Sequence, residues 1–375
     1  MSQNDTSQGR WLFWRFWACA SGFWKRKHAR VSWPLTVGLV ALALAQITVQ
    51  YRLNYWNRDF FNALERRDAA QLWEEAWLFA PLAGLSILLS VASVWGRMTT
   101  QRKWREWLTK HLLALWLKDG RYSGLKFVTS EHQNAEYRIC VDARIATDAP
   151  VDMAVGVLAA ITAAAVFTDV LWTVGGHLTL TMSGHQVTIS GYLVLGVGLY
   201  AFVFTTWTMI IGRKLSSIIQ SENQAEAEML AAATTIRESG DEAVRAEEGV
   251  AQRSPVWQAL RRVLERWRQV CWQLMGTTMV SQMDLLLAPV FAWVLCAPKY
   301  LAGTMTLGEL TQAAAAFVTL QMAFNWVVDN FQRLSDWRAA TNRVAALLLA
   351  LDQVETGHEA SAVPLRGEKQ AESKA

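Results

Sequence analysis

Six stretches of the chain are apolar over roughly the 20 residues that a helix needs to cross the hydrocarbon core of a bilayer. Inside lipid a backbone must satisfy its own hydrogen bonds, so each stretch is predicted to be a helix and not an open strand. The pattern predicts an all-α polytopic membrane protein with six transmembrane helices. Their approximate bounds are Trp33–Tyr55, Ala76–Trp95, Val151–Val174, Tyr192–Ile211, Val270–Ala297 and Leu310–Val328.

The long polar segments after the second and fourth spans also have helical character. Apolar residues recur at three- and four-residue spacing from Trp104 to Trp116, and residues 222–236 are rich in the helix formers Ala, Glu and Met. The spans are therefore expected to continue as long cytoplasmic helical extensions. Gly120 and Gly124 are predicted to break the first extension, and Pro255 the second.

A small hairpin is predicted between the third and fourth spans. Residues 178–182 alternate strictly between apolar and polar, Ser183 and Gly184 supply a turn, and Val187 and Ile189 resume the alternation. An isolated hairpin is only marginally stable, so it is expected to lean on the rest of the protein.

The distribution of basic residues sets the predicted orientation. Lys and Arg concentrate in the two long polar segments and near the N-terminus. The positive-inside rule therefore places both termini and both long segments in the cytoplasm, and the hairpin outside. The net charge of only +4 over 375 residues argues against a nucleic-acid-binding protein.

Three regions are predicted. Residues 1–32 begin with nine polar or small residues, apart from Met1, and then mix aromatic and basic side chains from Arg10 to Lys27. This mixture is typical of an amphipathic segment at the cytoplasmic interface, the alternative being a disordered basic tail. Residues 33–350 form the six-span membrane domain. Residues 351–375 are polar and contain Pro364 and Gly367, which predicts a disordered cytoplasmic tail.

The chain is predicted not to be an enzyme. It has no GxxxxGK[ST] phosphate loop, no nucleophile elbow and no HExxH sequence, so ATPase activity is expected only if a partner supplies it. The four cysteines are widely separated and form no CxxC pair, which argues against a metal site or a disulfide framework. No cofactor is expected.

Carboxylates in or beside the spans are the candidate functional residues, because a charge in hydrocarbon is costly and tends to face a cavity or a partner. Asp284 lies deepest, within the fifth span. Asp152 and Asp169 flank the third span, and Asp329 closes the sixth. All four are candidates for a substrate path or for proton coupling. For Asp152, Asp169 and Asp329, simple placement at the membrane interface is the alternative.

Several motifs, in one order, resemble a known family. Arg52–Leu64 resembles the outer end of the first span in the SbmA/BacA-like peptide transporters and their ATP-driven relatives, and Asn134–Asp142 is similar to the family's cytoplasmic N-P-D-Q-R-I-x-x-D motif. Residues 238–244, 297–303 and 329–339 continue the resemblance, which covers roughly residues 33–350. Ala135 and Tyr137 depart from the family's Pro and Gln, so that helix start is expected to be capped differently.

The resemblance implies an ABC exporter-type transmembrane fold that forms a homodimer and imports antimicrobial peptides, glycopeptides, cobalamin or similarly bulky solutes, driven by protons. The alternative is the permease half of an ABC transporter that needs a separate ATPase chain. A third hypothesis is a membrane scaffold without transport activity. The implied partners are the lipid bilayer, a second copy, the ATP-binding subunit of the alternative, and a peptide or bulky hydrophobic substrate.

The cytoplasmic motif is predicted to be structural, with its polar residues bridging neighbouring cytoplasmic helices. One helical turn separates Arg138 from Asp142, which predicts an ion pair between them. The motif residues concerned are Asn134, Glu136, Arg138 and Asp142.

Overall fold

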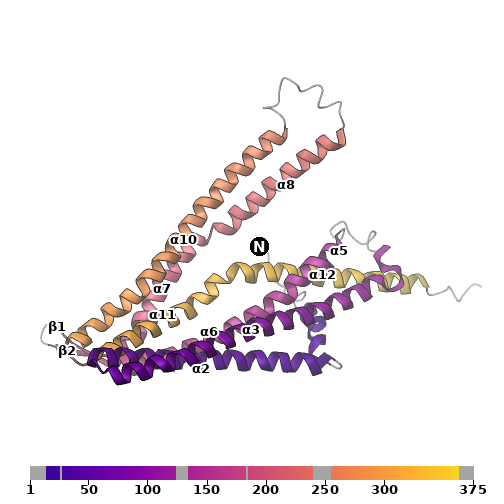
Figure 1. The fold of residues 1–375 in the computed structure, drawn as a ribbon. Coiled ribbons are helices and arrows are strands. Elements are labelled where there is room, and N and C mark those ends of the chain that lie inside the picture. The colour runs from indigo at the N-terminus through magenta and orange to yellow at the C-terminus, as the bar shows by residue number, and fades with distance from the viewer. Residues whose placement is uncertain (1–13, 26–27, 124–133, 183–184, 240–254, 363–375) are drawn as a thin grey trace, which may run out of the picture. The chain divides into compact units, whose positions relative to one another are not determined.

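The computed structural model describes residues 14–25, 28–123, 134–182, 185–239 and 255–362 (Figure 1). Helices make up almost all of this part of the chain. The long helices are α2 (Ala29–Arg66), α3 (Ala69–Leu117), α6 (Ala143–Gly175), α7 (Tyr192–Gly212), α8 (Leu215–Ser239), α10 (Pro255–Leu301), α11 (Leu307–Asp329) and α12 (Phe331–Ala362). Shorter segments are the 3₁₀-helices Ser21–Trp24 and Lys118–Gly120, α5 (Ala135–Tyr137) and a π-helix at Arg138–Asp142.

Within the described residues, five helical segments are long and apolar enough to cross a membrane. They are Ala29–Arg66, Ala69–Leu117, Ala135–Gly175, Tyr192–Arg237 and Pro255–Leu301. The prediction of an all-α polytopic membrane protein is confirmed. The predicted sixth span is a helix, α11, but its amides Gln312, Gln321 and Asn325 lower its mean hydropathy, so its membrane crossing stays a prediction.

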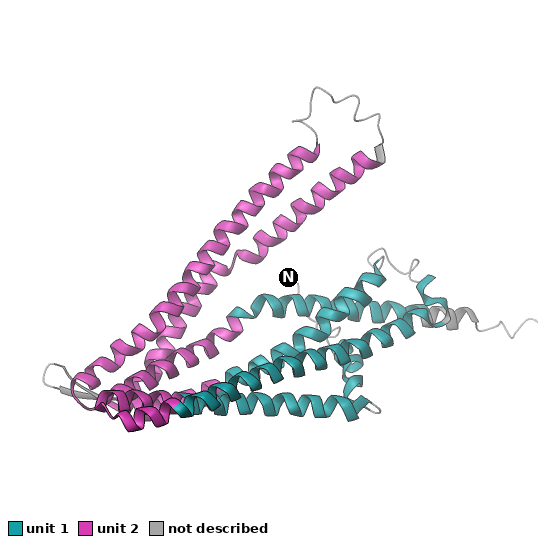
Figure 2. Cartoon of the chain, viewed as in Figure 1, with its two compact units in different colours: residues 1–53, 77–162, 329–375 teal, residues 54–76, 163–328 magenta. Residues whose placement is uncertain are grey.

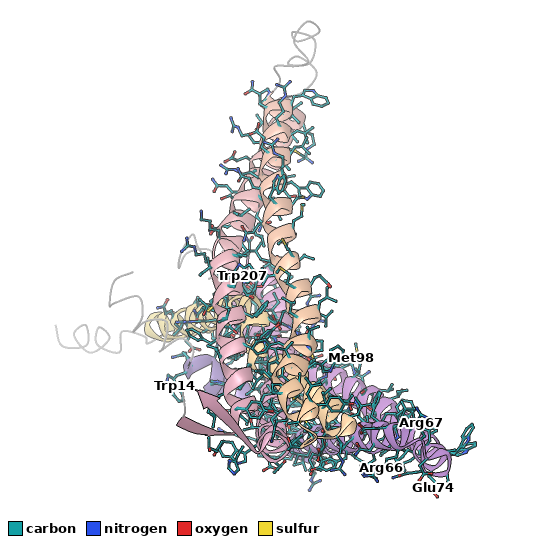
Figure 3. The ribbon with its side chains drawn as sticks, turned by 90° about the vertical axis from the view of Figure 1, so that its left-hand side faces the viewer. Trp14, Arg66, Arg67, Glu74, Met98 and Trp207 are labelled. Carbon is teal, nitrogen blue, oxygen red and sulfur yellow. The ribbon has the colours of Figure 1, made fainter. Side chains whose placement is uncertain are left out.

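Many large apolar side chains on these helices point outward (Figure 3). Met98 on α3 is 64% exposed and Phe202 on α7 is 70% exposed. A soluble protein rarely leaves so many large apolar side chains in contact with water, whereas a membrane protein presents them to lipid. The charged Arg66, Arg67 and Glu74 lie instead at the turn between α2 and α3 (Figure 3).

The predicted helical extensions are confirmed, as are breaks at Gly120 and Pro255, whereas Gly124 lies outside the described residues. The 49 residues of α3 are about 74 Å long at 1.5 Å per residue, well beyond the thickness of a bilayer. The chain then breaks at Gly120, whose φ of 69° lies in the left-handed region. Helix α10 begins at Pro255, a residue favoured in a first helical turn. Helices α8 and α10 lie side by side, joined by an ion pair of 3.3 Å between Glu228 and Arg262.

The predicted hairpin is also confirmed. Strands β1 (His177–Met182) and β2 (His185–Ser190) pair antiparallel, with Leu178 opposite Ile189 and Leu180 opposite Val187. Next to its base, Lys299 of α10 donates a hydrogen bond of 2.6 Å to the carbonyl of Gly175, the last residue of α6.

The chain divides into two compact units (Figure 2). Unit 1 comprises Met1–Leu53, Trp77–Thr162 and Asp329–Ala375, and unit 2 comprises Asn54–Ala76 and Ala163–Val328. The core of unit 1 is built around fully buried side chains of α3 and α12, including Trp104, Leu108, Leu347 and Leu351.

The described part of the N-terminal segment packs into this core. Residues 14–20 are helical, and the side chains of Phe16 and Phe23 are 0% and 2% exposed. The ring of Phe23 lies 6.4 Å from that of Trp104 on α3. Part of the aromatic face predicted for the interface is thus covered by protein. The position of the segment relative to the membrane stays a prediction, and residues 1–13 lie outside the described residues.

The prediction of a disordered tail from residue 351 is wrong for residues 351–362. Helix α12 continues to Ala362, because Leu347, Leu351 and Val354 recur at helical spacing and are buried in the core of unit 1. The charged composition of the tail concealed this short apolar continuation. Residues 363–375 lie outside the described residues.

Candidate functional site

A polar cluster surrounds Asp284 in unit 2, near the midpoint of the predicted fifth span. Its carboxylate accepts hydrogen bonds from Asn325 Nδ2 at 2.8 Å and from Gln321 Nε2 at 3.4 Å. Both amides belong to α11, where a spacing of four residues places them on one face. The cluster therefore joins α10 to α11 through a charged group and two amides.

Helix α7 completes the cluster. Thr205 donates a hydrogen bond of 3.3 Å to Asn325 Oδ1, and the Tyr200 hydroxyl donates one of 3.3 Å to the backbone carbonyl of Asp284. The Tyr200 ring stacks on Phe204 at 4.5 Å and also touches Phe291 and Phe317. An aromatic group thus borders the cluster and holds α7, α10 and α11 together.

The chemistry of this cluster suits a proton or a polar group of a solute. The hydrogen-bond partners of the Asp284 carboxylate described above are neutral amides, so a proton could neutralise the carboxylate without breaking an ion pair with them. Gln321 is 2% exposed, and its Oε1 atom has no hydrogen-bond partner among the described residues. A buried carbonyl oxygen without a partner is costly, so water or a solute is expected to complete this site.

Asp152 occupies a different setting, in unit 1. Its carboxylate accepts hydrogen bonds from Arg97 of α3, at 3.5 Å, and from Arg333 of α12, and its side chain is only 18% exposed. The two guanidinium groups tie three helices together. These contacts favour a structural role for Asp152 over proton transfer or substrate binding.

The remaining two candidates lie on exposed positions. Asp169 on α6 is exposed, and its backbone carbonyl accepts a hydrogen bond of 2.9 Å from Thr173. Asp329 is exposed at the last residue of α11, and belongs to unit 1. Neither residue contributes to the cluster around Asp284.

The motif at Asn134–Asp142 contains a bidentate ion pair, as a structural role would require. Asp142, 1% exposed, accepts hydrogen bonds of 2.9 and 2.7 Å from Nε and from a terminal nitrogen of Arg343 on α12. The hydrogen bonds that Arg343 donates to Asp142 raise the pKa of its guanidinium above its already high value. The partner of Asp142 was expected to be Arg138, but residues 138–142 form a π-helix, in which helical-turn spacing no longer applies.

The other two motif residues lie on the surface. Asn134 precedes α5 as its N-cap, without a side-chain capping bond among the described residues, and Glu136 is exposed in the first turn. Their predicted bridging of neighbouring helices stays a prediction.

The motif at Arg52–Leu64 holds the start of α11 in unit 2. Asn62 Oδ1 accepts a hydrogen bond of 3.0 Å from the backbone N–H of Gly308, and Glu65 accepts one of 3.0 Å from Leu307. One turn further into α11, the carbonyl of Gln312 accepts a hydrogen bond of 3.1 Å from the side chain of Asn54. Side chains of α2 thereby satisfy backbone donors that a helix N-terminus otherwise leaves unpaired.

Sequence reasoning missed several residues that the structure brings into these sites. The amides of Gln321 and Asn325 carried a usable signal, because two amides four residues apart in an apolar helix mark a polar face. Arg333, Arg343 and Thr205 carried none, since their partners lie far away along the chain.

The chain matches the family description "ABC transporter transmembrane region 2" over residues 26–301. It is 25% identical over 346 residues to the inner membrane ABC transporter ATP-binding protein YddA of Escherichia coli, covering 89% of this chain and 60% of that protein. It is 22% identical over 348 residues to ABC transporter D family member 2, chloroplastic, of Arabidopsis thaliana, covering 91% of this chain and 46% of the relative. The chain thus spans about half the length of these relatives.

Proposed function

Because the chain belongs to the ABC transporter transmembrane region 2 family, we propose that it forms the membrane-spanning half of a solute transporter. Two copies form the pathway, and an ATP-binding domain or subunit outside the described residues supplies ATP hydrolysis. The family match over residues 26–301 carries this proposal. The relatives' names, which include "ATP-binding protein", favour ATP over a proton gradient as the energy source.

The architecture is consistent with this role. Helices α3 and α10 are much longer than a bilayer is thick, and α8 follows the predicted fourth span. Helices that extend beyond the membrane in this way are suited to docking a soluble ATPase on the cytoplasmic side. The chain itself supplies the pathway and no catalytic residue. By the resemblance of its motifs, the solute is a peptide or a similarly bulky molecule, imported across the bacterial inner membrane.

Uptake of a fluorescent proline-rich peptide into proteoliposomes tests the energy source. With the chain as the sole protein, we expect no accumulation under an imposed pH gradient. Accumulation is expected when an ATP-binding subunit that copurifies with the chain is added together with ATP. Accumulation by the chain alone, abolished by an uncoupler, would overturn the proposal in favour of proton-driven transport.

The second candidate, proton-driven import, is favoured by one observation, the carboxylate of Asp284 among neutral partners. In that case Asp284→Asn, which keeps the shape and removes the titrating group, should reduce uptake driven by a pH gradient by roughly tenfold or more. Asp169→Asn is the matched control, because it removes an exposed carboxylate of the same unit and should leave uptake unchanged. If Asp284→Asn takes up as much peptide as Asp169→Asn and the unaltered chain, proton coupling at Asp284 is ruled out.

A further inference from the structure

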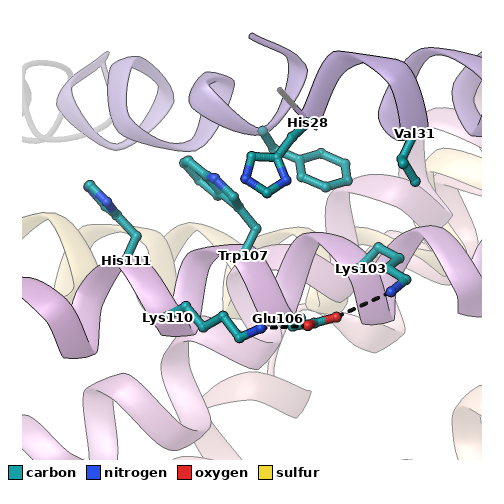
Figure 4. A pocket seen from close by; sticks show the side chains of 8 residues that line it. His28, Val31, Lys103, Glu106, Trp107, Lys110 and His111 are labelled. Atoms are coloured by element: carbon teal, nitrogen blue, oxygen red, sulfur yellow. Dashed lines mark hydrogen bonds and ion pairs between the residues drawn. The ribbon is translucent and has the colours of Figure 1, made fainter. Parts of the chain in front are cut away.

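A cavity of about 440 Å³ lies in unit 1, between the start of α2 and the extension of α3 (Figure 4). His28, the residue before α2, and Val31 of α2 line one side of it. Lys103, Trp107 and Lys110 line it from α3. The cavity therefore combines cationic, aromatic and aliphatic side chains, and it belongs to none of the sites described above.

Its charge is positive and organised around one carboxylate. Glu106, which also lines the cavity, accepts hydrogen bonds from Lys103 at 3.4 Å and from Lys110 at 2.7 Å, shown as dashed lines in Figure 4. The hydrogen bond from Lys110 and the charge of Lys103 lower the pKa of Glu106. Each ammonium has three donors, so donors remain for an oxyanion after the bond to Glu106 is made.

The cavity is expected to lie near the membrane surface. Val31, which lines it, comes just before Trp33, where the first span is predicted to begin, on the side that the positive-inside rule assigns to the cytoplasm. Its own Trp107 stacks on His111, with ring centroids 5.5 Å apart and an angle of 5°. Tryptophan is enriched at this depth, because its ring is amphipathic.

An apolar pocket of about 180 Å³ lies further along α2 toward the middle of the first span. Thr36, Leu39 and Val40 of α2 line it, together with Trp104 and Leu158. The Trp104 ring is in contact with Phe23, which lines the first cavity. A basic cavity at the surface and an apolar pocket on its membrane side match the two ends of a lipid.

We propose that the basic cavity binds the phosphate headgroup of an anionic phospholipid from the cytoplasmic leaflet. Lys103 and Lys110 donate to the phosphate oxygens, as ammonium groups do in phosphate sites. Trp107 and Val31 contact the glycerol backbone, and the apolar pocket takes part of an acyl chain. This lipid site does not depend on the solute or the energy source of the transporter.

The first measurement is the binding of phosphatidylglycerol to the purified full chain in nanodiscs of phosphatidylcholine. The second is the amount of phosphatidylglycerol that the chain retains after detergent washing, measured by mass spectrometry. We expect Lys103→Gln/Lys110→Gln to bind about tenfold more weakly than the unaltered chain. The matched control is Arg102→Gln/Arg105→Gln, which removes two exposed cations of the same helix that do not line the cavity. The control is expected to retain the lipid.

A second variant tests the cavity without changing its charge. Val31→Trp should fill the space beside Lys103 and reduce lipid retention as well. Equal losses in the lysine and arginine variants would overturn the proposal, because the attraction would then be general to the basic surface. Displacement of the lipid by millimolar inorganic phosphate would also overturn it, since the site would then recognise a free anion.

Discussion

Gly308→Ala is expected to lower the free energy of unfolding by about 2–4 kcal/mol, from overpacking and from a lost backbone hydrogen bond. A Cβ at this position would stand 2.1 Å from the backbone carbonyl oxygen of Arg58 and 2.5 Å from Asn62 Oδ1. The Arg58 oxygen belongs to the backbone, so it cannot rotate away as a side chain could. Helices α2 and α11 would have to separate, and the bond from Gly308 N–H to Asn62 would be broken.

Gly198→Ala is the control for this experiment. Gly198 is a helical, exposed residue of α7, and a Cβ there would meet no atom within 4 Å. Because alanine favours a helix over glycine by about 1 kcal/mol, this variant should be neutral or slightly more stable. The measurement is thermal unfolding of both variants in detergent. A Gly308→Ala protein as stable as Gly198→Ala would refute the close packing of α2 and α11.

Arg343→Ala is expected to destabilise the protein by about 3–5 kcal/mol, because it leaves a buried carboxylate without its cation. Asp142 is 1% exposed and lies among apolar residues of the unit 1 core, whereas the side chain of Arg343 is 46% exposed. Water can solvate Arg343 when its partner is lost, but it cannot reach Asp142. Removing the cation should therefore cost more than removing the carboxylate.

The comparison with Asp142→Asn tests this asymmetry. Asp142→Asn keeps the shape of the side chain and removes the charge, so it should destabilise less than Arg343→Ala. The double variant Asp142→Asn/Arg343→Ala should recover much of the stability lost in Arg343→Ala, as a thermodynamic cycle of unfolding in detergent would measure. Additive losses in the double variant would show that the two residues act independently.

Local patterns predicted most of the fold. The run at Tyr192–Ile211 became α7 almost without change, and the alternation at residues 178–182 became β1. In both cases the sequence pattern that predicts the element lies entirely within that element. A membrane span is recognised by the length and hydropathy of one apolar run, and a strand by the alternation of apolar and polar residues. The tail was mispredicted for the converse reason. Helix α12 continues past residue 350, where Leu351 and Val354 are buried by distant parts of unit 1.

The sequence by itself determined that the protein is helical and spans a membrane, because hydrophobic length is a property of consecutive residues. It also singled out Asp284, since a carboxylate in an apolar span is visible without any partner. Only the tertiary structure decided that Asp284 meets Asn325, that Asp152 is clamped by two arginines and that Asp142 pairs with Arg343. These partners lie 41 to 201 positions away from the carboxylates, and only the packing of the helices brings them together.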